Sequence, residues 1–81
     1  MAKKEFTTYS ALLGKRVEVL IHLRNKEYVV IGKLVEFFEK NQALILVDYG
    51  IYEPTENGLK EYAIGDGKMI EVRAWVWIRE I

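Results

Sequence analysis

A glycine in the middle of a long strand-forming run is the sequence feature that most constrains the fold. Residues 28–38 are mostly β-branched, aromatic or aliphatic, and Gly32 lies near their centre. A glycine inside a strand weakens it and usually marks a bend or a bulge. A strongly bent strand takes part in two sheets, as a small barrel requires. The run therefore predicts a bent strand within a small β-barrel.

Alternating side chains predict a half-buried strand over residues 15–23. One face is mainly polar, and the other is apolar, consisting of Val17, Val19, Ile21 and Leu23. Further strand-like segments are residues 43–49, 59–64 and 69–81. Typical strands have about five or six residues, so we expect a sharp corner near Ala74 to split the last segment.

Polar and glycine-containing segments separate these strands. The predicted turns are residues 24–27, 39–42 and 65–67, and the predicted loop is residues 50–58. At the beginning, helical spacing of apolar residues predicts a short helix over residues 3–13, which Gly14 ends. The expected fold is a single, mainly β domain over residues 1–81. It consists of this helix and a strongly bent, five-stranded antiparallel barrel over about residues 15–81.

Composition favours association over a free monomer. The chain has 81 residues, of which 51% are hydrophobic, and this is more apolar surface than one small core easily hides. The formal net charge is 0, which argues against strong non-specific binding to nucleic acid. Residues 1–26 are net basic and residues 27–81 net acidic. This asymmetry leaves two readings open, a basic patch on one face or charges scattered over solvated faces.

Several functional classes have little support in the sequence. The chain has no cysteine, so disulfides and thiolate metal sites are excluded, and a reducing compartment such as the cytoplasm fits. No apolar run approaches the ~18 residues of a membrane span, and the basic beginning lacks the apolar segment of a signal peptide. With one histidine and one serine, we expect neither an enzyme nor a metal or cofactor site.

The chain resembles the Sm/LSM family over about residues 5–80. The segments that carry the resemblance are Gly14-Lys15-Arg16-Val17-Glu18-Val19, Gly32-Lys33-Leu34 with Phe37, Leu44-Ile45-Leu46, Ile70-Glu71-Val72-Arg73-Ala74 and Trp75-Val76-Trp77-Ile78. The Tyr-Lys-His motif of bacterial Hfq is absent, so the resemblance is to a divergent archaeal- or phage-type member. It implies an N-terminal helix and an SH3-like (Sm-like) barrel.

The resemblance also implies a ring and an RNA pocket. Family members pair their fourth and fifth strands between subunits, which implies a homo-oligomeric ring of about five to seven copies. The family's pocket for an unstacked RNA base uses a loop Asn and an Arg. The loop positions here are Lys40, Asn41 and Gln42, and the Arg is Arg73. The family's Asp falls on Phe38, and Ala74 replaces the Gly after the Arg.

Each candidate site has an alternative reading. Residues Lys40, Asn41 and Gln42 either contact single-stranded RNA or form an ordinary polar turn. Arg73 either lines the pocket or pairs with a neighbour such as Glu71. The candidate subunit interface is Val72, Trp75, Val76, Trp77 and Ile78. Trp75 and Trp77 are expected on one face, in an interface or in the core.

Two functions follow as hypotheses. The first is a homo-oligomeric Sm-like ring that binds single-stranded RNA or scaffolds RNA–protein assemblies. The second is a structural or protein-interaction module on the same barrel, without RNA binding. Tyr49, Tyr52 and Tyr62 flank the predicted loop, where they either contact a ligand or pack across strands.

Overall fold

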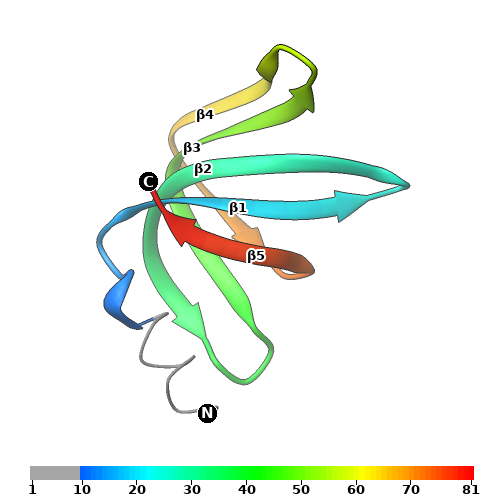
Figure 1. Cartoon of the computed structure of the whole chain (residues 1–81). Coiled ribbons are helices and arrows are strands. Elements are labelled where there is room, and N and C mark those ends of the chain that lie inside the picture. Colours follow the sequence, from blue (N-terminus) through cyan, green and yellow to red (C-terminus); the bar gives the residue numbers. More distant parts are fainter. Residues whose placement is uncertain (1–9) are drawn as a thin grey trace.

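The computed structural model describes residues 10–81, which form one antiparallel sheet of five strands (Figure 1). The strands are β1 (Arg16–Leu23), β2 (Lys26–Phe38), β3 (Ala43–Thr55), β4 (Gly58–Val72) and β5 (Trp75–Glu80). Their order across the sheet is β4-β3-β2-β1-β5. The first four strands therefore form successive hairpins, and β5 crosses back to pair with β1.

The predicted five-stranded SH3-like (Sm-like) barrel is wrong, because the described strands form a sheet that is not closed and leave β4 and β5 at its opposite edges. Closure would require β4 to pair with β5. Only Arg73 and Ala74 separate these two strands, and beyond this corner the short β5 pairs with β1 from Val17 to Ile21. The bends that a barrel needs are present, but the two edge strands do not meet within residues 10–81.

The predicted helix over residues 3–13 falls largely outside the described residues. From residue 10 onward no helix is among the elements, and only Ser10 and Ala11 have helical backbone before a turn. This turn is attached to the sheet, because the Gly14 amide donates to the Leu34 carbonyl at 2.7 Å and Leu12 is buried in the core.

The core lies on one side of the bent sheet and is built mainly by β1, β2 and β3. Its fully buried side chains are Val17, Val19, Val30, Leu34, Leu44 and Leu46. The alternation predicted over residues 15–23 is confirmed for Val17 and Val19, whereas Ile21 is half-buried and Leu23 exposed. Exposure grows along β1 toward the tip of the β1–β2 hairpin, and Figure 1 shows this tip projecting past β5.

The predicted irregularity at Gly32 is confirmed. The β2–β3 register shifts between Ile31 and Lys33, and Figure 1 shows β2 curving strongly. A Cβ atom placed on Gly32 would lie 3.0 Å from the Tyr49 Cβ and 3.0 Å from the Val47 carbonyl oxygen. The absence of a side chain therefore lets β3 approach closely where β2 bends.

We expect Gly32→Ala to lower the free energy of unfolding by about 1–3 kcal/mol, since the added methyl group meets backbone as well as side chain. Urea unfolding followed by circular dichroism measures this decrease. Glu36→Ala is the control, because it shortens an exposed side chain of the same strand. Equal stability of the two variants would contradict a close approach at Gly32.

Two predictions on the second half of the chain are wrong. The predicted loop over residues 50–58 is mostly strand, since β3 and β4 pair as far as Thr55 and Gly58 around a turn at residues 56–57. The strand predicted over residues 59–64 is confirmed, as the first part of the longer strand β4. The predicted turn over residues 65–67 is also part of β4.

A bulge replaces that predicted turn. The β3–β4 register passes from Val47 opposite Met69 to Tyr49 opposite Gly65, so Asp48 faces three residues of β4. The Gly67 amide donates to Asp48 Oδ1 at 2.6 Å and thereby closes the bulge. The chain thus continues along the sheet at the Gly-Asp-Gly sequence. The corner predicted near Ala74 is confirmed by the break between β4 and β5.

Candidate functional site

The residues predicted to contact RNA lie at one end of the sheet. The turn of residues 39–42 joins β2 to β3, and the corner that contains Arg73 joins β4 to β5. Pairing of Leu44 with Val72 brings the turn and the corner to the same end. The Trp75 indole Nε1 then donates to the Gln42 carbonyl oxygen at 2.6 Å and ties them together.

Within the turn, both amide side chains support the local backbone. Gln42 Nε2 donates to the Glu39 carbonyl at 3.1 Å, and Asn41 Oδ1 accepts from the Ala43 amide at 3.3 Å. Gln42 has a φ of 58°, which few non-glycine residues adopt. These contacts match the reading of an ordinary polar turn, and they leave Lys40 as an exposed cation at its tip.

Arg73 forms the ion pair that the sequence offered as an alternative. Its Nε lies 2.8 Å from Glu71 Oε2, and the Arg73 side chain remains 68% exposed. An exposed pair of this kind contributes only about 0–1 kcal/mol. A phosphate that approaches Arg73 therefore competes with a weak partner.

The residues predicted to form a subunit interface differ in their surroundings. Val72 is buried in the core, Trp75 and Ile78 pack against it, and Val76 is 57% exposed. In the β1–β5 pairing, Leu20 lies opposite Trp77 and the next residue, Ile21, lies opposite Trp75. Val76 is therefore an extra residue that forms a bulge in β5.

This bulge corrects the expectation that both tryptophans share a face. Trp75 lies on the core side, whereas Trp77 is opposite Leu20 on the other side of the sheet. There the Arg79 guanidinium lies 4.7 Å from the centre of the Trp77 ring, and Arg79 also pairs with Glu18. Strand alternation alone predicts the wrong side of the sheet for Trp77, because the extra residue of the bulge reverses the alternation.

A cleft of about 610 Å³ lies at the far end of the sheet, and we call it the hairpin cleft. The β1–β2 and β3–β4 hairpins diverge at their tips in Figure 1, and the cleft is lined by residues of both. Its lining residues are Ile21, Leu23, Arg24, Lys26, Tyr28, Ile51 and Tyr62. Ile21 and Ile51 also pack against the core, so the cleft continues the core side of the sheet.

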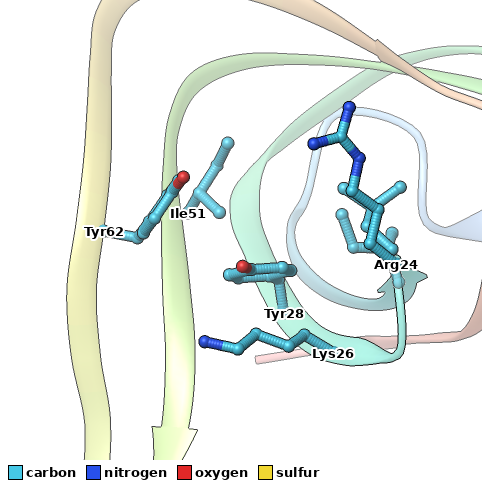
Figure 2. A pocket seen from close by; sticks show the side chains of 7 residues that line it. Arg24, Lys26, Tyr28, Ile51 and Tyr62 are labelled. Atoms are coloured by element: carbon cyan, nitrogen blue, oxygen red, sulfur yellow. The ribbon is translucent and has the colours of Figure 1, made fainter.

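The hairpin cleft combines aromatic rings with cations. Figure 2 shows Tyr62 and Ile51 on one side and Arg24 on the other, with Tyr28 and Lys26 between them. The Tyr28 and Tyr62 ring centres are 5.2 Å apart, and the ring planes are tilted by 51°. Lys26 Nζ lies 3.4 Å from Glu53 Oε2 at the rim.

Of the residues that line this cleft, sequence reasoning named only Tyr62 as a candidate for contact with a ligand. The other lining residues belong to strands and a turn that are far apart in the sequence, and they converge only through the strand order. One local signal was available, because an arginine occupies a tight hairpin turn that favours glycine or asparagine.

From residue 10 to residue 81, no group of three or more His, Asp or Glu side chains is arranged to hold a metal ion. The same residues include no helix that is long and apolar enough to cross a bilayer. No protein-family model matches the sequence, and no curated protein matches it.

Proposed function

We propose that this protein is a homo-oligomeric module that binds single-stranded RNA at the end of the sheet where the 39–42 turn meets the β4–β5 corner. The observation that supports the proposal is the hydrogen bond from Trp75 to Gln42, which joins the β4–β5 corner that contains Arg73 to the turn. Lys40 and Arg73 supply exposed positive charge for phosphate, and Asn41 and Gln42 supply hydrogen-bonding groups.

The edges of the sheet support self-association. An edge strand presents backbone donors and acceptors that can pair with a second chain. Among the described strands, the edges are β4 and β5. β4 carries the exposed apolar side chains Ile64 and Met69, and Val76 is exposed on β5. Pairing β4 of one copy with β5 of the next would cover this surface and repeat the RNA-contacting end in each subunit.

We expect Arg73→Ala and Lys40→Ala each to weaken binding of oligo-uridine several-fold. Each should also flatten the salt dependence of binding, by about 0.7 in the log–log slope for each phosphate that the variant no longer neutralises. Fluorescence anisotropy at several salt concentrations measures both quantities. Lys60→Ala is the matched control, since this exposed lysine lies near the β3–β4 turn. Absence of binding to the unaltered protein at low salt would overturn the RNA proposal.

Two observations favour a second function, a protein-interaction module without RNA binding. The exposed apolar side chains of β4 suit a protein partner, and the formal net charge of 0 gives no general attraction for nucleic acid. In that case, the edges would bind protein and oligo-uridine would not bind at any salt concentration.

A further inference from the structure

The turn that contains Arg24 does not need an arginine side chain in order to fold. It forms the two-residue turn between β1 and β2 with Asn25, and φ is 49° for Arg24 and 67° for Asn25. Consecutive positive φ angles are typical of type I′ turns, which favour Asn-Gly and related pairs. A non-glycine residue at this position costs conformational energy, and residues in such backbone conformations cluster at functional sites.

The charges around the hairpin cleft are unequal. Lys26 pairs with Glu53, whereas Arg24 forms no ion pair with any residue from 10 to 81. Arg24 therefore gives the cleft a positive end. A guanidinium donates two parallel hydrogen bonds to a phosphate, which suits it to an anionic ligand group.

The opposite side of the cleft suits an aromatic ring. Tyr62 is 64% exposed, and its ring is tilted against Tyr28 rather than stacked on it, so a ring face stays accessible. Aliphatic side chains of Ile21, Leu23 and Ile51 complete the apolar wall. The volume of about 610 Å³ lies inside the ~300–1,000 Å³ range of small-molecule sites.

We propose that the hairpin cleft binds a nucleoside monophosphate, with the base against Tyr28 and Tyr62 and the phosphate at Arg24. This site lies at the opposite end of the sheet from the 39–42 turn, and the inference does not rest on RNA binding there. The tyrosine rings bind the base and Arg24 binds the phosphate. A nucleoside or inorganic phosphate alone therefore binds more weakly than the nucleotide.

Titration with uridine and adenosine 5′-monophosphates, followed by NMR of the uniformly labelled protein, tests the site. Shift changes are expected at Arg24, Tyr28 and Tyr62, with both nucleotides binding more tightly than uridine, adenosine or inorganic phosphate. Shift changes confined to other regions, or equal affinity for nucleotide and phosphate, would overturn the proposal.

Three variants separate binding from folding. Tyr62→Ala is expected to weaken binding about tenfold, a typical effect of removing a stacking partner. Arg24→Gly is expected to weaken binding similarly while raising the unfolding temperature, because glycine suits the positive φ. Glu53→Gln is expected to tighten binding several-fold, because it releases Lys26 toward the phosphate.

Two controls complete the experiment. Lys33→Ala removes an exposed cation of β2 that does not line the cleft, and it should leave nucleotide affinity unchanged. Arg73→Ala should also leave it unchanged, which distinguishes this site from the RNA-contacting end. Unaltered binding by Tyr62→Ala and Arg24→Gly, or weaker binding by Glu53→Gln, would refute the proposed geometry.

Discussion

Leu34→Ala is expected to lower the free energy of unfolding by about 2–5 kcal/mol, the range for removing a large aliphatic side chain from a packed core. Leu34 has no exposed surface and belongs to the main core cluster. Its backbone also joins two segments, because its amide donates to the Lys15 carbonyl at 2.9 Å and its carbonyl accepts from Gly14 at 2.7 Å. The substitution therefore leaves a cavity where the chain before β1 is attached to β2.

This decrease is large for such a small domain. At 0.05–0.15 kcal/mol per residue, a chain of this size has a stability of roughly 4–12 kcal/mol. Urea unfolding at 25 °C should show an earlier midpoint, or no folded baseline at all. Leu59→Ala is the matched control, since Leu59 is 47% exposed near the β3–β4 turn. A decrease below about 1 kcal/mol for Leu34→Ala would contradict its central place in the core.

The sequence correctly predicted the features that depend on only a few neighbouring residues. Alternation located the buried residues Val17 and Val19, and a glycine in an apolar run located the irregularity of β2 at Gly32. Excess length located the corner at Ala74. In each case the relevant physical cause, such as side-chain period or backbone freedom, acts over a few residues.

Contacts between distant residues account for the errors. The Gly65–Gly67 segment has turn chemistry, but a hydrogen bond from Gly67 to Asp48 keeps it in the sheet as a bulge. Trp77 changes face because of a bulge that is defined only by the register with β1. A closed barrel and an open bent sheet require the same bends, so the sequence pattern does not distinguish them.

The candidate sites also depend on contacts between residues that are distant in the sequence. The 39–42 turn and the β4–β5 corner that contains Arg73 lie at the same end of the sheet, and the bond from Trp75 to Gln42 that joins them has no signal in the sequence. The hairpin cleft depends on where two hairpins diverge, and no contiguous motif encodes that geometry.

Blocking either edge strand is expected to reduce the native mass to one subunit, 9.5 kDa. Ile64→Lys with Met69→Lys places charges on β4, and Val76→Lys places one on β5; all three positions are exposed, so folding should be retained. Edge charges, especially lysine, are how sheet proteins prevent edge-to-edge pairing. Light scattering on a sizing column should give several times 9.5 kDa for the unaltered protein and a single subunit for each variant.

Mixing the two variants gives the sharper result. If β4 of one copy pairs with β5 of the next, the interface is heterologous, and each variant retains the edge that the other lacks. The β4 variant still offers β5, and the β5 variant still offers β4, so an equimolar mixture should form a 1:1 dimer and stop there. An interface of β4 with β4 predicts instead that the Val76→Lys protein dimerises alone. Association of either variant by itself, or none in the mixture, would contradict β4–β5 pairing, with circular dichroism as the check that both proteins are folded.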